Sequence, residues 1–144
     1  MAILRALCVS DERCNVKVPL KFGRFLFGGL KGDAHFGFSD REVSLLREED
    51  VKEAEREAGF EFPVGCLAEN LTVAGLPEEI PLGSILQIGT ARLEVIEKGK
   101  RPGEPHSYGY RGWCLLPKVG YFLKVVQQGE ASPGDEVFLE IAST

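Results

Sequence analysis

The sequence of 144 residues predicts a mainly β fold, a closed or nearly closed β-barrel with one or two short helices. Many short apolar segments of strand length are separated by turns rich in Gly and Pro. Only one segment has a clear helical pattern, whereas an alternating α/β sheet would need a helix after most strands. The length suits one domain over residues 1–144, and no internal repeat or linker interrupts it.

Composition and charge exclude several classes of protein. Hydrophobic residues make up 44% and charged residues 27%, which is typical of globular domains and argues against disorder. The net charge of −5 argues against broad nucleic-acid binding, which usually needs a basic surface. No apolar run approaches the roughly 18 residues of a membrane span, and the N-terminal run is too short for a signal peptide. We therefore expect a cytoplasmic protein.

The four cysteines lie far apart, and no Cys-x-x-Cys pair occurs. This spacing indicates neither a disulfide scaffold nor a zinc site, so reduced thiols are expected. Cys8 falls in a strand pattern and is expected in the core. Cys66 follows Gly65 in a loop and is a candidate reactive thiol of second rank.

The first third of the chain predicts short strands and a flexible loop. Residues 2–9 form a first strand, a polar turn follows over 10–15, and residues 16–20 and 24–27 are further short strands. Four glycines between positions 28 and 37 then break regular structure, and Asp33 and His35 lie among them. These two side chains either tie the loop down by a hydrogen bond or contact a ligand.

The clearest helix covers residues 48–58 and follows a buried strand that ends the segment 41–46. Its first turn is acidic, as the helix dipole favours, and Gly59 is placed to cap the C-terminus. A weak apolar face at helical spacing consists of Val51, Ala54 and Ala58. We expect this helix to cover an end or opening of the sheet, with its charge run facing solvent.

Strand patterns dominate the remainder. Glu69 and Asn70 stand side by side in the apolar segment 67–73, where they either brace loops or face a ligand. Residues 85–88 and 91–96 form a hairpin around Gly89 and Thr90, with Gly first as a type II′ turn prefers. Two more strands are predicted over residues 121–126 and 136–141, with a loop between them.

Residues 97–117 concentrate chemistry-bearing side chains. Four basic residues, Lys98, Lys100, Arg101 and Arg111, oppose two acidic ones, giving this segment a net charge of +2. Cys114 lies beside Arg111, and nearby positive charge stabilises a thiolate, so Cys114 is the leading nucleophile candidate. The alternatives are a buried structural thiol and a solvated loop rich in Pro and Gly.

Several of these segments, in this order, resemble the MOSC domain, the family named after the C-terminal part of molybdenum-cofactor sulfurases. The resemblance extends from about Leu4 to Leu139 and is nearest to small stand-alone bacterial members or those fused to a molybdopterin-biosynthesis domain. The matching residues are Gly32, Asp33, Ala34, His35, Arg41, Val43, Ser44, Leu45, Leu46, Ala68, Glu69, Asn70, Leu71, Leu82, Gly83, Ile88, Gly89, Pro133, Gly134 and Asp135.

The resemblance implies a pyruvate-kinase-barrel-like fold and a role around the molybdenum cofactor. Such a protein either carries activated sulfur for the cofactor or binds its pterin and metal. The family cysteine that follows a Gly-Lys pair falls here on Pro102 or Pro105, depending on the register. A later family pattern, Gly-Asp-Cys-x-x-Pro, matches Gly112, Trp113, Cys114 and Pro117, with Trp113 in place of the acid. Cys66 also replaces a residue that is usually acidic in the family.

These matches lead to a set of expected roles. Cys114 would accept sulfur or ligate molybdenum, and basic side chains would neutralise the cofactor phosphate. The predicted cofactor-binding residues are Asp33, His35, Arg41, Glu69, Asn70, Lys100, Arg101, His106 and Arg111. Expected partners are a PLP-dependent cysteine desulfurase or a molybdoenzyme, with no nucleic acid and no membrane.

Two alternatives to this function remain open. The first is a non-catalytic barrel that binds an anionic ligand or acts as an adaptor after losing the family cysteine. The second is a component of a system that reduces N-hydroxylated compounds. That reading rests only on what the family includes, and it would need an electron donor.

Overall fold

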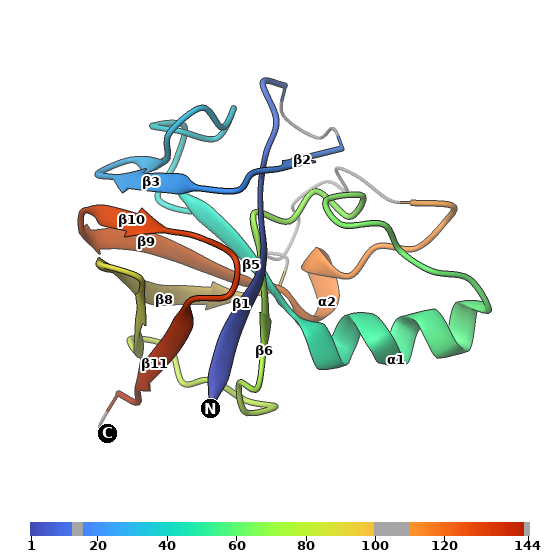
Figure 1. Cartoon of the computed structure of the whole chain (residues 1–144). Helices are drawn as coiled ribbons and strands as arrows, with labels where there is room; N and C mark the ends of the chain where they lie inside the picture. Colours follow the sequence, from blue (N-terminus) through green and yellow to red (C-terminus); the bar gives the residue numbers. More distant parts are fainter. Residues whose placement is uncertain (13–15, 100–109, 143–144) are drawn as a thin grey trace.

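The computed structural model describes residues 1–12, 16–99 and 110–142, and within these ranges seven strands close into a barrel (Figure 1). Around the barrel the order is β11-β7-β8-β9-β5-β6-β1, and β1 pairs with β11 to complete the circle. Only the β5–β6 pair is parallel among these neighbours. The barrel strands are β1 (Ala2–Val9), β5 (Val43–Arg47), β6 (Leu71–Ala74), β7 (Ile85–Ile88), β8 (Ala91–Lys98), β9 (Tyr121–Gln127) and β11 (Glu136–Glu140). The predicted fold class is therefore confirmed.

Alternation along the strands fills the barrel interior. In β8, Ala91, Leu93 and Val95 are fully buried, while the residues between them are partly exposed, as a two-residue period requires. The predicted hairpin between β7 and β8 is confirmed, with Ile88 paired to Ala91. Gly89 has a φ of 58°, the left-handed value that the first position of a type II′ turn needs.

A second, smaller sheet lies across one end of the barrel, as Figure 1 shows. It has the order β10-β3-β4, formed by β3 (Gly23–Leu26), β4 (Gly29–Leu30) and β10 (Gly129–Ala131). The prediction of a loop between the last two barrel strands is wrong over β10, because Glu130 pairs with Arg24 from far along the chain. Strand β2 (Val18–Pro19) is shorter than predicted and pairs with the end of β1.

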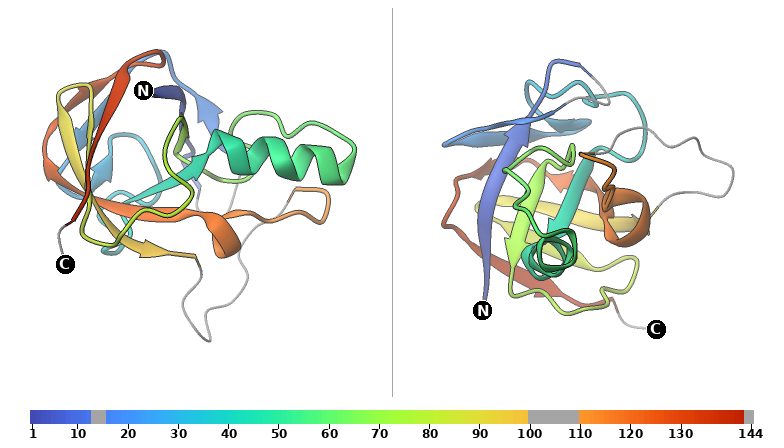
Figure 2. Two further views of the ribbon diagram at one scale, coloured as in Figure 1. Left: turned by 90° about the horizontal axis from the view of Figure 1, so that it is seen from below. Right: turned by 90° about the vertical axis from the view of Figure 1, so that its right-hand side faces the viewer.

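Helix α1 (Glu48–Ala58) confirms the predicted helix, and Gly59 caps it with a φ of 81° and a bond from its N–H to the Glu55 carbonyl. A second, short helix, α2 (Leu116–Val119), lies on the same side of the barrel (Figures 1 and 2). A hydrophobic cluster separate from the barrel core packs beneath them and consists of Leu46, Val51, Ala54, Phe62, Cys66, Leu67 and Leu115.

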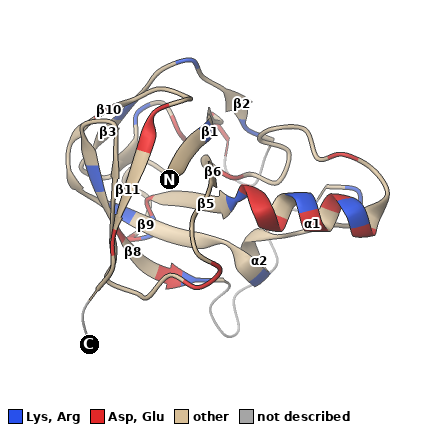
Figure 3. Cartoon of the chain, turned by 60° about the horizontal axis from the view of Figure 1, so that its bottom comes forward, with Lys and Arg blue, Asp and Glu red and all other residues tan. Residues whose placement is uncertain are grey.

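Charged residues occur along α1 (Figure 3), and those on its outer face are exposed, as predicted. Lys52, Glu53, Arg56 and Glu57 are exposed, whereas Val51 and Ala54 are buried. Among the described residues, no helix has the length and apolar character needed to cross a membrane.

Candidate functional site

Three polar side chains meet at the end of the barrel near β2, and we call Lys17, Asp33 and His35 the buried polar centre. Lys17 precedes β2, and the other two residues lie in the loop that follows β4. The Lys17 Nζ atom lies 2.6 Å from Asp33 Oδ1 and 3.5 Å from His35 Nδ1. The Lys17 and Asp33 side chains are only 1% and 0% exposed, so this ion pair is shielded from water.

Asp33 organises the centre because its carboxylate accepts hydrogen bonds from several directions. The backbone N–H groups of Ser10 and His35 donate to it at 3.0 and 3.2 Å, in addition to the Lys17 ammonium. Burial by itself would raise the pKa of Asp33. The hydrogen bonds from His35, Lys17 and Ser10 outweigh it and hold that pKa well below its usual range. The carboxylate is therefore ionised at neutral pH.

His35 is the member of the centre that a ligand can reach, since its side chain is 31% exposed. Its Nδ1 lies 3.2 Å from Asp33 Oδ2, so a proton on Nδ1 donates to the carboxylate and leaves Nε2 for an outside partner. The Phe38 ring meets the imidazole edge to face, with 6.4 Å between ring centroids. His35 is thus oriented to exchange a hydrogen bond or a proton with a bound molecule.

Lys17 was not among the predicted site residues. A lysine between two valines in a strand pattern is expected to face solvent while the valines face the core. The structure has the reverse arrangement, with Lys17 buried and Val16 and Val18 exposed. Its position depends on the loop before β6, because the Lys17 N–H donates to the Gly65 carbonyl at 2.9 Å. Gly65 has a φ of 86°, and a Cβ atom there would overlap the Lys17 carbonyl oxygen.

The adjacent residues Glu69 and Asn70 have different roles. Asn70 braces β5 to β1, because its Oδ1 accepts the Ser44 N–H and its Nδ2 donates to the Cys8 carbonyl, both at 3.0 Å. Glu69 is buried and accepts the Leu67 N–H at 3.1 Å. Burial raises the pKa of Glu69 to about 7, against the opposing effects of backbone N–H groups and Lys17. Cofactor binding by either residue stays a prediction.

Two buried thiols adjoin Glu69. Burial, reinforced by the Glu69 charge, raises the pKa values of Cys8 and Cys66 to about 12 each. Both thiols are therefore protonated at neutral pH and unsuited to nucleophilic attack. The prediction that Cys8 belongs to the interior is confirmed.

The basic candidates in the described part of the chain lie against aromatic rings. The Arg41 guanidinium carbon is 4.4 Å from the centroid of the Phe122 ring, and that of Arg111 is 4.0 Å from the Phe60 ring. Arg111 occupies a tight turn with a φ of 49°, and its ring partner Phe60 lies just after the C-terminus of α1. Lys100, Arg101 and His106, like the prolines at positions 102 and 105, fall outside the described residues.

Cys114 lies between this turn and α2 and is partly exposed. Burial raises the pKa of its thiol, and the nearby Lys118 charge opposes that rise only in part. A sulfur-accepting or metal-binding role for Cys114 stays a prediction. In the described ranges, no group of three or more His, Cys, Asp or Glu side chains is arranged to hold a metal ion.

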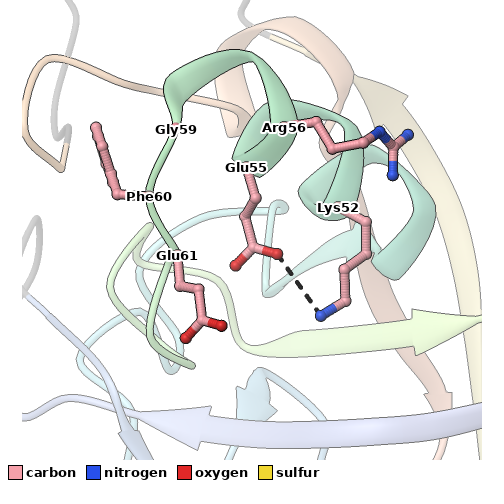
Figure 4. A pocket seen from close by; sticks show the side chains of 6 residues that line it. All are labelled: Lys52, Glu55, Arg56, Gly59, Phe60 and Glu61. Carbon is pink, nitrogen blue, oxygen red and sulfur yellow. Dashed lines mark ion pairs between the residues drawn. The ribbon is translucent and has the colours of Figure 1, made fainter.

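A shallow pocket of about 310 Å³ lies at the C-terminal end of α1 (Figure 4). Lysine and glutamate side chains of α1 pair across it, with 3.6 Å between Lys52 Nζ and Glu55 Oε1. Its lining consists of Lys52, Glu55, Arg56, Gly59, Phe60 and Glu61. None of these residues belongs to the buried polar centre, and the mixed charges favour no particular ligand.

Comparison with known proteins identifies one family. A family model described as MOSC domain matches residues 31–138, which is most of the chain. No curated protein sequence matches the chain.

Solved structures with this fold include three bacterial proteins. The YuaD protein from Bacillus subtilis is 20% identical with a TM-score of 0.73, and the match covers 99% of this chain and 98% of that one. YiiM from Geobacillus stearothermophilus is 22% identical with a TM-score of 0.68, over 96% of this chain and 75% of that one. YiiM from Escherichia coli is 22% identical with a TM-score of 0.60, over 99% and 70%. At these identities the likeness concerns the fold.

Proposed function

The chain belongs to the MOSC domain family, and on this premise we propose that it binds the molybdenum cofactor at the buried polar centre. The observation that supports this site is that His35 is partly exposed while its Nδ1 contacts the buried Asp33 carboxylate, which is paired with the buried Lys17 ammonium. When bound, the cofactor supplies the oxygen- or sulfur-transfer chemistry of its molybdenum. The metal would arrive already held by its pterin, which agrees with a site made of hydrogen-bonding groups rather than metal-binding clusters.

The residues of the centre have distinct tasks in this proposal. Asp33 fixes the orientation of the His35 ring, and Lys17 keeps Asp33 ionised while adding positive charge near an incoming anion. In the imidazolium form both ring nitrogens donate, so His35 Nδ1 bonds to Asp33 while Nε2 donates to an anionic group of the cofactor. Arg41, Arg111, Lys100, Arg101 and His106 remain the predicted sources of further positive charge.

We expect His35→Gln to lower cofactor occupancy by about tenfold or more, because it removes an exposed hydrogen bond to a charged group without leaving a buried cavity. Protein purified from a host that makes the cofactor is assayed for molybdenum by elemental analysis and for pterin by fluorescence. Glu53→Gln, on the exposed face of α1, is the control and should retain wild-type occupancy. Equal occupancy in His35→Gln would contradict the site. Absence of molybdenum and pterin from every variant would instead favour the non-catalytic barrel.

Sulfur transfer through Cys114 is the second candidate function, and partial exposure of its thiol favours it. The raised pKa of that thiol argues against it, because the thiolate is the reacting species. We therefore expect iodoacetamide to alkylate Cys114 more slowly at neutral pH than it alkylates free cysteine. Mass spectrometry measures the rate, with Cys114→Ser as the control. Fast alkylation, or a persulfide on Cys114 after incubation with a cysteine desulfurase, would restore sulfur transfer as the leading function.

A further inference from the structure

The interior near β2 holds an unequal number of charges. Two carboxylates, those of Asp33 and Glu69, and the Lys17 ammonium are all at least 95% buried. Lys17 is committed to Asp33 by the 2.6 Å ion pair. Glu69 is thus a buried carboxylate whose neighbouring cation is already neutralised by another group, and such an acid favours its protonated form.

The backbone links Glu69 directly to the buried polar centre. Glu69 and Gly65 belong to one turn, in which Glu69 Oε1 accepts the Leu67 N–H and the Ala68 N–H donates to the Gly65 carbonyl. The same carbonyl accepts the Lys17 N–H, so the turn is fixed against the residue that carries the ammonium. The turn therefore holds Glu69 at a fixed position near Lys17, whose positive charge lowers the pKa of Glu69.

Among the described residues, the other titratable groups that interact with Glu69 bring no compensating positive charge. Cys8 reaches it from β1 and Cys66 from its own loop, and both are neutral thiols. Glu55 on α1 adds negative charge near Cys66. The charge of the interior is therefore set by whether Glu69 carries a proton.

We propose that Glu69 takes up a proton when an anion binds at His35, beside the buried Lys17, so that anion affinity decreases as the pH rises. This inference rests on the proposed function, because it concerns the regulation of the same site. With Glu69 protonated, the charges of Lys17, Asp33 and Glu69 sum to zero, and with Glu69 ionised they sum to −1. An anion binds more tightly to the first state, and by reciprocity its binding strengthens the hold of Glu69 on its proton.

The pKa of Glu69 supports a decrease of anion affinity with rising pH. The pKa of Glu69, about 7, means that both states are populated near neutral pH. Affinity is then highest below this pKa and decreases above it. A coupling of ordinary size corresponds to at least about a fivefold change in the dissociation constant.

Sulfate is the probe, since its charge stays constant across this pH range whereas that of phosphate changes. Isothermal titration calorimetry at constant ionic strength measures the sulfate dissociation constant at about pH 6 and about pH 8.5, which lie below and above the pKa of Glu69. The wild-type dissociation constant should increase at least about fivefold. Glu69→Gln should show a clearly smaller change than the wild type, because glutamine is neutral at both pH values and its Oε1 still accepts the Leu67 N–H. Glu57→Gln makes the same charge change on the exposed face of α1 and should keep the wild-type pH dependence.

A second measurement on the wild-type protein does not depend on how the variant folds. Carboxyl carbon resonances followed by NMR should show the pKa of Glu69 increasing when sulfate is added. A purely structural role for Glu69 would weaken binding in Glu69→Gln equally at both pH values, and this would overturn the inference. Binding that is independent of pH, or a full pH dependence retained in Glu69→Gln, would overturn it as well. Absence of sulfate binding at every pH would contradict the proposed anion site itself, so the two failures are distinguishable.

Discussion

Lys17→Met is expected to lower the free energy of unfolding by about 3 to 5 kcal/mol, the cost of removing one partner from a buried ion pair. Asp33 stays behind as an ionised carboxylate that is 0% exposed. Its bonds from Ser10 and His35 remain, but they do not replace a full positive charge. Urea unfolding, with a check that the slope is unchanged, measures the loss.

Two further variants show whether the loss comes from the pair. Lys17→Met combined with Asp33→Asn should recover part of the stability, since no unpaired charge is then buried. Lys52→Met is the matched control: its ion pair with Glu55 involves a lysine side chain that is 61% exposed, and its effect should be close to zero. If the free energy of unfolding of Lys17→Met lay within about 1 kcal/mol of the wild-type value, the ion pair would contribute little to stability.

The contribution of Asp33 also predicts an acid dependence. Because the folded-state pKa of Asp33 is lower than the unfolded value, its stabilising effect is fully present above the unfolded pKa of about 3.9. The effect is lost as the pH falls from there toward the folded-state pKa. Urea unfolding at a series of acidic pH values should therefore show wild-type stability decreasing over this range. In Lys17→Met this loss should be smaller and complete at a higher pH, since one of the groups that lower the folded-state pKa of Asp33 is gone, while its onset at the unfolded-state pKa is unchanged.

The elements that the sequence predicts well are those specified by neighbouring residues. The bounds of α1 coincide with the prediction because an acidic first turn and a C-terminal Gly59 mark both ends locally. The hairpin around Gly89 is found because two alternating segments flank a two-residue turn. The barrel follows from many such segments together with a single long helix.

The parts that the sequence does not predict depend on distant partners. β10 looks like a loop in isolation and becomes a strand only because β3 lies beside it. Lys17 has the local pattern of an exposed strand residue, and its burial is decided by Asp33 and by the turn at Gly65. Asp33 and His35 were predicted as candidates, but the cation that completes their centre could not be found without the fold.

Gly65→Ala is expected to destabilise the protein by about 3 kcal/mol or more, for two separate reasons. Its φ of 86° lies in the left-handed region, which costs a residue with a Cβ about 1 to 2 kcal/mol. The added Cβ would also overlap the Lys17 carbonyl oxygen, a backbone atom that cannot rotate away, and overpacking of this kind costs about 1 to 3 kcal/mol. Urea unfolding measures the sum.

Gly59→Ala separates the conformational cost from the cost of overlap, because Gly59 has a similar φ of 81° and no atom within 4 Å of the added Cβ. It should lose only the conformational cost of about 1 to 2 kcal/mol. The excess loss in Gly65→Ala then measures how tightly the turn of Glu69 is packed against Lys17. If the two variants lose the same stability, the turn moves freely relative to Lys17. Glu69 would then not be held at a fixed position relative to Lys17 and the buried polar centre.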